Sequence, residues 1–157
     1  MSSLPLPPGA RFVKRRLDQV AVGLINQALA EPLADGVFDF LEGRCLEVRL
    51  QDWGLALPLT WRAGRLAAAH GMAPEARIGG DPGAFVLMAG ERADPDTLFF
   101  QRRLSIQGDT ELGLMAKNAL DQLDPEALPA RFRRPLLRLA GLVESGERRF
   151  RPSARSV

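Results

Sequence analysis

The chain has 157 residues, 46% of them hydrophobic and 25% charged, with a formal net charge of +2. Length and composition suit one soluble globular domain that can bury a substantial core. The single cysteine, Cys45, excludes an intramolecular disulfide and a cysteine-rich metal site. No run approaches the roughly 18 apolar residues of a membrane span, and the start lacks the apolar segment of a signal peptide. We therefore expect a cytoplasmic protein.

The charge is segregated along the chain. Residues 1–16 carry four basic side chains and no acidic one, residues 131–157 carry eight arginines against two glutamates, and the middle holds nine basic and seventeen acidic side chains. Basic ends attract anionic lipid headgroups or nucleic-acid phosphates, and a solvated tail is the plainer interpretation. Few aromatic residues stand among these basic side chains, which counts against base stacking, so no nucleic acid is expected. The residues that we expect to dock transiently on an anionic membrane are Arg11, Phe12, Lys14, Arg15, Arg16, Arg131, Arg133 and Arg134.

Three segments follow from the patterns: a flexible proline-rich lead at 1–10, a single domain at 11–145 and a basic tail at 146–157. The domain opens with a helix predicted over 12–30. Its apolar residues, among them Val13, Leu17, Val20 and Leu24, recur at three- and four-residue spacing. This stripe favours packing on a core, and its alternative is an interfacial helix that meets a membrane.

Strands are predicted next. Residues 45–50 alternate in the period-two pattern of a strand with one buried face. In 53–61 all the large apolar residues share one face, and Pro58 places this strand at a sheet edge or beside a bulge because proline donates no hydrogen bond. A turn at 62–65 returns the chain into a strand at 66–70, and shorter strands are expected at 76–78 and 104–107.

Helices complete the expected fold. Asp81, Asp94 and Asp109 stand where N-caps belong, ahead of helical segments at 82–90, 95–100 and 110–123, and a last helix is predicted over 129–143. The order of elements predicts an α+β fold with a mainly antiparallel sheet of about five strands, covered by helices on one face.

Three passages carry a resemblance to a known family: DFLEGRCLEVRLQDWGL (39–55), DPDTLFFQRRLSIQGDTELG (94–113) and LGLMAKNALDQLD (112–124). They resemble the lipid-binding domain of the sterol carrier protein type 2 family, and within it the short bacterial UbiT group of accessory factors of oxygen-independent ubiquinone biosynthesis. The resemblance implies an apolar cavity between sheet and helices that holds acyl or isoprenoid lipid. It also implies the iron–sulfur hydroxylases UbiU and UbiV as functional partners.

The resemblance and the apolar faces together give the candidates for lipid binding. Two roles remain open for Arg102 and Arg103. One of them can meet a polar group of the ligand at the cavity mouth, but surface exposure or pairing with Asp94 or Asp96 is favoured. The residues expected to line the cavity are Trp53, Leu55, Leu57, Leu59, Trp61, Phe85, Met88, Phe99, Phe100, Leu104, Ile106, Leu112, Leu114 and Met115.

Candidate groups for chemistry are few. His70 is the sole histidine, and an inert thiol is the favoured interpretation of Cys45. No metal, cofactor or catalytic residue is expected, which indicates binding rather than turnover. The favoured hypothesis is a non-catalytic accessory factor that presents prenylated ubiquinone intermediates or membrane lipid to pathway enzymes. The alternatives are a phospholipid-binding or transfer protein that docks through its basic ends, and an arginine-rich adaptor for protein or nucleic acid.

Overall fold

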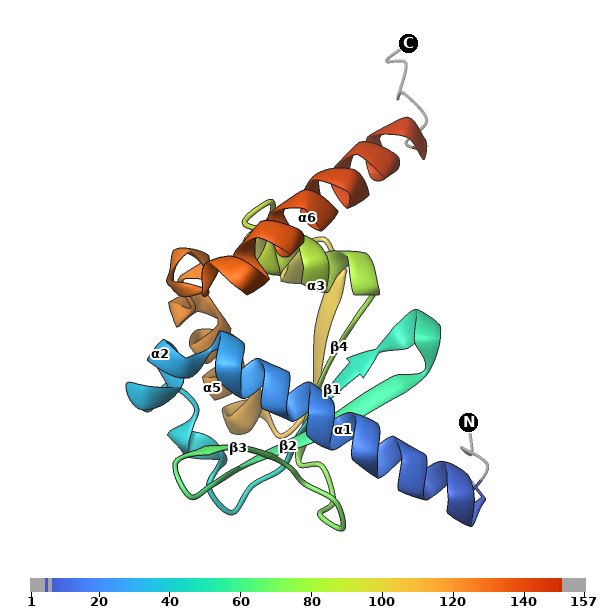
Figure 1. The fold of residues 1–157 in the computed structure, drawn as a ribbon, viewed down its shortest axis with the longest axis vertical. Helices are drawn as coiled ribbons and strands as arrows, with labels where there is room; N and C mark the ends of the chain where they lie inside the picture. The colour runs from blue at the N-terminus through green and yellow to red at the C-terminus, as the bar shows by residue number, and fades with distance from the viewer. Residues whose placement is uncertain (1–4, 6, 151–157) are drawn as a thin grey trace.

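The computed structural model describes residues 5 and 7–150. A five-stranded sheet in the order β3-β2-β1-β4-β5 forms its centre, and the helices lie against it (Figure 1). The strands are β1 (Leu46–Leu50), β2 (Leu55–Arg62), β3 (Arg65–Ala68), β4 (Ala76–Gly80) and β5 (Leu104–Gly108). The helices are α1 (Pro8–Ala28), α2 (Ala30–Ala34), α3 (Pro82–Ala89), α4 (Pro95–Phe100), α5 (Thr110–Gln122) and α6 (Ala130–Phe150), and the 3-10 turns are η1 (Asp39–Leu41), η2 (Gln51–Trp53) and η3 (Pro125–Ala127).

The sheet is mixed. β1 pairs with β4 in parallel, whereas β1–β2, β2–β3 and β4–β5 are antiparallel. The predicted α+β class and the mostly antiparallel sheet of five strands are therefore confirmed. The parallel pair was not predicted, because strand patterns carry no information on which strands become neighbours.

Pro58 lies in an interior strand, and the prediction of an edge strand is correct only locally. It pairs with Glu47 of β1 on one side of β2. On the other side β3 pairs only with the stretch that starts at Leu59, and the Pro58 carbonyl accepts a hydrogen bond from the Ala69 amide at 2.9 Å. The missing N–H of Pro58 therefore costs the sheet no ladder bond.

The two faces of the sheet differ in chemistry. The face under the helices is apolar, with Leu46, Leu59 and Ile78 buried in one core. The opposite face carries charges, where Glu47 accepts from Arg49 at 2.7 Å and lies 3.4 Å from Arg77. The prediction of helices on one face is thus confirmed: the helices pack on the apolar face, and the opposite face carries ion pairs.

Polar contacts fix α1 to the sheet and to the chain that follows β3. The Asn26 amide donates to the Leu66 carbonyl at 2.9 Å and accepts from the Leu66 amide at 3.1 Å, which satisfies the free edge of β3. Buried Asp18 accepts from Lys14 at 2.6 Å, and its other partner is His70 at 3.0 Å. His70 thus holds a helix in place.

The predicted packing of the α1 stripe on the core is wrong. Val13, Leu17, Val20 and Leu24 are between 50% and 63% exposed, and it is Val22 that lies in the core. Val22, Ile25 and Leu29 form a second apolar stripe on another side of the helix. Asp18 interrupts that stripe in the sequence, and its bonds to Lys14 and His70 make its burial tolerable.

The remaining boundaries shift slightly. α1 begins at Pro8, inside the predicted lead, and α6 continues to Phe150, inside the predicted tail. Residues 1–4, 6 and 151–157 of those two segments lie outside the described residues. The side chains of Asp81, Asp94 and Asp109 each accept a hydrogen bond from the first turn of α3, α4 and α5, so the three predicted N-caps are confirmed.

An ionic cluster joins α6 to the start of α3. Arg103 lies 3.0 Å from Asp81 and 2.6 Å from Glu147. Partial burial alone would raise the pKa of Asp81, but hydrogen bonds from Arg103 and from the Ala84 amide outweigh it and lower that pKa. Arg103 therefore pairs with other carboxylates than the predicted Asp94 or Asp96.

Candidate functional site

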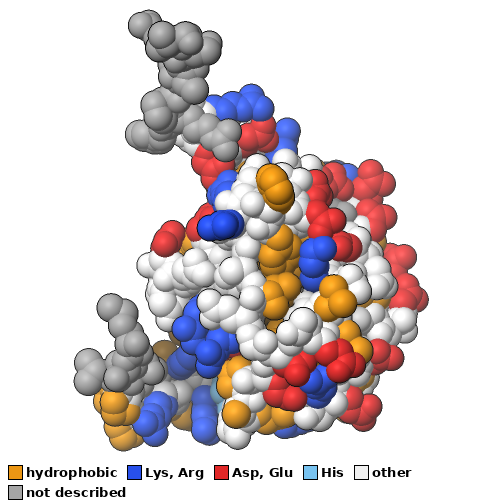
Figure 2. Space-filling view, turned by 180° about the vertical axis from the view of Figure 1, so that it is seen from behind, with side chains coloured by type: hydrophobic (Ala, Val, Ile, Leu, Met, Phe, Trp, Pro, Cys, Tyr) orange, Lys and Arg blue, Asp and Glu red, His pale blue; other side chains and the backbone are white. Residues whose placement is uncertain are grey.

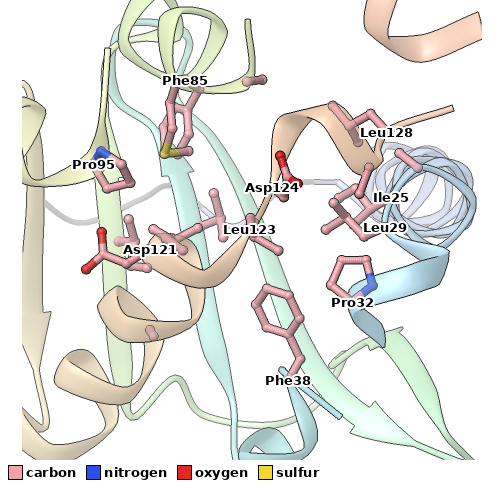
Figure 3. Close-up of a pocket in the computed structure, with 18 of the residues that line it drawn as sticks. Ile25, Leu29, Pro32, Phe38, Phe85, Pro95, Asp121, Leu123, Asp124 and Leu128 are labelled. Atoms are coloured by element: carbon pink, nitrogen blue, oxygen red, sulfur yellow. The ribbon is translucent and has the colours of Figure 1, made fainter. Parts of the chain in front are cut away.

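An apolar pocket of about 770 Å³ lies between the covered face of the sheet and the helices. In Figure 3, Phe85 and Pro95 lie on one side of it, and Ile25, Leu29 and Pro32 lie on the other. Its sheet wall is made by Leu46 and Val48 of β1, Leu59 of β2, Leu66 of β3 and Ile78 of β4. The helical walls come from the ends of α1, α3 and α5 and from the segment around Leu128.

The position of the pocket follows from where the helices begin and end. Asp81 and Pro82 start α3 directly after β4, so Phe85 and Met88 face back over the sheet. α5 starts at its Asp109 cap after β5 and brings Ala116 and Leu120 to the opposite wall. The pocket is the space that α3 and α5 leave between them over the sheet.

The polar residues that line the pocket are mostly acidic. Glu91, Asp94, Asp121 and Asp124 contribute carboxylates, and Arg92 is the one cation among the lining residues. Hydrogen bonds from the Thr97 amide and hydroxyl lower the pKa of Asp94. Carboxylates at such a position accept hydrogen bonds from hydroxyl groups and repel anionic groups.

Of the fourteen candidates for lipid contact, Leu59, Phe85 and Met88 line this pocket. Three more pack against the core without lining the pocket, namely Leu57, Trp61 and Ile106. Leu112 is fully buried in the core. Leu104 and Phe99 belong to a second, smaller core cluster with Leu98. The remaining five are exposed, namely Trp53, Leu55, Phe100, Leu114 and Met115. The structure thus divides the predicted wall among pocket, core and surface.

Several lining residues escaped the sequence analysis. Ile25, Leu29 and Pro32 come from the end of α1 and from α2, and Phe38 and Leu41 come from the turn before β1. The spacing of Val22, Ile25 and Leu29 is helical and could have indicated a second apolar stripe. Nothing in the sequence around Phe38 and Leu41 distinguishes pocket from core.

The predicted docking residues fall into two groups. Arg11, Phe12, Arg15 and Arg16 are exposed on α1, where the Arg16 guanidinium lies 5.3 Å from the Phe12 ring. Figure 2 shows basic side chains beside exposed apolar ones near this end of the chain. Arg131 donates to Gln27 at 3.2 Å, so the start of α6 reaches the same helix.

The other predicted docking residues differ in their surroundings. Lys14 is engaged by Asp18 and also donates to the Ala56 carbonyl at 2.9 Å. Arg133 lies 3.7 Å from Glu91, and Arg134 is exposed on α6. The free cations of this group are thus fewer than the sequence indicates.

The described residues offer little for catalysis. Burial raises the pKa of the Cys45 thiol, and Glu47 and Glu75 add to the rise, which fits an inert thiol. Within residues 5 and 7–150, no three His, Cys, Asp or Glu side chains gather in a way that could hold a metal ion. In the same part of the chain, no helix is both long enough and apolar enough to cross a membrane.

Comparisons with known proteins agree with this architecture. The SCP-2 sterol transfer family matches residues 25–121. The ubiquinone biosynthesis accessory factor UbiT of Escherichia coli K12 is 38% identical over 128 residues, which are 82% of this chain and 74% of that protein, and UbiT of Escherichia coli O157:H7 matches equally. Among solved structures, the UbiJ-SCP2 ubiquinone synthesis protein superimposes with a TM-score of 0.50 at 16% identity, covers 73% of this chain and 97% of its own, and supports the fold. The chain therefore belongs to the SCP-2 sterol transfer family.

Proposed function

We propose that this chain is a non-catalytic lipid-binding accessory factor of ubiquinone biosynthesis. Its pocket holds a prenylated ring intermediate and presents it to the enzymes of the pathway. The observation that carries the proposal is an apolar pocket of about 770 Å³ in a chain 38% identical to UbiT.

Hydrophobic burial supplies enough affinity for such a role. A prenyl tail that buries about 400 Å² against the pocket walls gains roughly 10 kcal/mol before the cost of association. No covalent bond and no metal is needed. Phe85, Met88 and Leu59 are the sequence-predicted residues that we propose to contact the tail.

The acidic side chains favour a ring intermediate over a phospholipid. Asp121 and Asp124 can accept hydrogen bonds from the hydroxyl groups of a prenylphenol. A phosphate headgroup would lie among lining residues that include four acidic side chains and one arginine. The alternative function, phospholipid binding or transfer, therefore ranks second.

We propose that the ligand enters from an anionic membrane on which α1 docks. The exposed stripe of Leu17, Val20 and Leu24 is the apolar face of an interfacial helix, and Arg16 and Arg131 stand beside it. Each basic side chain near an anionic surface contributes about 1 kcal/mol. Farther along, Ile25 of α1 and Leu29 directly after it line the pocket wall, so this segment links the membrane to the site. The protein would be cytoplasmic with peripheral membrane association.

The partners in this proposal are the UbiU and UbiV hydroxylases of the oxygen-independent pathway. The remaining alternative is an arginine-rich adaptor, which predicts salt-sensitive binding to RNA or to an acidic protein and no bound lipid. The apolar pocket, which an adaptor would not need, supports the carrier over the adaptor.

Quinone analysis of a deletion strain tests the pathway assignment. Without oxygen, the strain should lose ubiquinone and accumulate an earlier prenylated intermediate, and the wild-type gene should restore the quinone. With oxygen, the quinone content should stay normal. Unchanged ubiquinone in both conditions would contradict the proposal.

A further inference from the structure

A second hollow, of about 380 Å³, lies between α1 and the hairpin of β2 and β3. Gln19 and Asn26 line it from the helix, and Arg62 and Arg65 line it from the hairpin. Its lining includes two arginines and no acidic residue. This polar groove therefore differs in charge from the acidic lining of the apolar pocket.

The two arginines oppose each other across the hairpin. Arg62 and Arg65 are register partners on either side of a two-residue turn. Like charges directly opposite each other on antiparallel strands destabilise the pair. The hairpin therefore gains no stability from this pair, and an anion bound between the two arginines would offset the repulsion.

Neither arginine has an acidic partner among the described residues. Arg44, Arg49, Arg77, Arg92, Arg103, Arg133 and Arg148 all form ion pairs there. Arg62 makes only a 3.8 Å contact with the Met72 sulfur, and both Arg62 and Arg65 are exposed. Apart from this weak contact, no hydrogen bond engages the two guanidinium groups among the described residues, so their other donors can meet a ligand.

We propose that this groove binds a phosphate group between Arg62 and Arg65. Two guanidinium forks match the oxygens of one phosphate and relieve the repulsion between the arginines. The Gln19 amide offers a further donor, and Arg15 stands one turn earlier on the same helix. Gly23 leaves room above the groove, since a Cβ at that position would meet no atom within 4 Å.

The phosphate can come from a lipid headgroup or from solution. The groove borders α1 on the side of Gln19 and Asn26, so a headgroup reaches it if this side of the helix meets a membrane. Free phosphate would reach the same donors without a membrane. The inference goes beyond the proposed function and does not depend on the apolar pocket.

The test replaces both arginines by glutamine, R62Q with R65Q. The matched control is R138Q with R149Q, which removes two charges from exposed positions on α6. Amide NMR shifts follow a titration with inorganic phosphate, at an ionic strength held constant with chloride. Co-sedimentation follows binding to phosphatidylcholine vesicles with and without phosphatidylglycerol. Circular dichroism checks that every variant is folded.

We expect phosphate to shift the Gln19, Gly23 and Gly64 amides in a saturable way, and R62Q/R65Q to weaken this binding about tenfold or more. If the same variant also loses binding to the anionic vesicles relative to the control, a lipid headgroup is the source. If vesicle binding is unchanged, free phosphate is the source. The proposal is overturned if phosphate causes no saturable shift and the two double variants bind vesicles equally. Lipid retained in the apolar pocket is measured separately and should be the same in both.

Discussion

Gly113 offers a sharp test of how α5 packs on the sheet. It is buried in α5, and a Cβ added there would collide with the Ile106 side chain of β5. Overpacking of this kind costs about 1–3 kcal/mol. Alanine also favours the helix by about 0.5–1 kcal/mol relative to glycine. We therefore expect Gly113→Ala to lower the free energy of unfolding by about 0.5–2 kcal/mol.

Urea unfolding followed by circular dichroism measures this difference. The matched control is Gly146→Ala in α6, because a Cβ there meets nothing within 4 Å. That variant should gain up to about 0.5–1 kcal/mol from helix propensity alone. The packing argument is refuted if Gly113→Ala stabilises the protein as much as Gly146→Ala does.

Three further predictions concern the ionic cluster and α1. Arg103→Gln should lower the free energy of unfolding by about 1–3 kcal/mol, because two partly buried carboxylates lose their partner; faster amide exchange in α6 would locate the effect, and unchanged exchange would contradict it. The lowered pKa of Asp81 stabilises the fold at pH values above its unfolded pKa of about 3.9, and this contribution disappears as the pH falls through the folded pKa. Asp81→Asn should therefore flatten the acid side of the plot of unfolding free energy against pH. A plot parallel to that of the wild type would argue against the cluster. Leu17→Ser should weaken binding to anionic vesicles severalfold with little change in stability, since Leu17 is 63% exposed. The control Leu142→Ser changes a side chain that is 71% exposed on α6 and should bind vesicles as the wild type does. Equal losses of binding in both variants would contradict docking through α1.

Much of the fold could be predicted from local patterns. Asp81, Asp94 and Asp109 indicated three helix starts because a side chain that caps a helix acts over three residues. The alternation in β1 and β2 indicated that Leu46 and Leu59 share the face turned to the core. The parallel pairing of β1 with β4 depends on contacts between distant segments, and no local pattern carries it.

The pocket was harder to predict than the fold. Period-two alternation gives the face of a strand but not how far helices extend along it, so Leu59 lines the pocket while Leu55 of the same face is exposed. On α1 the sequence offers two apolar stripes. The one interrupted by Asp18 faces the sheet, because Asp18 pairs with Lys14 one turn earlier on the helix and with His70 across the fold. A distant partner such as His70 cannot be read from spacing.

The most direct test of lipid carriage is native mass spectrometry of the gently purified protein, with identification of the released ligand. Ala28→Phe places a ring at the pocket wall, and Ala30→Phe makes the same change at an exposed position outside the lining. We predict one prenylated ring molecule bound to the wild type and to Ala30→Phe, with occupancy strongly reduced in Ala28→Phe. Absence of any hydrophobic ligand, or equal occupancy in the two variants, would contradict the proposed function.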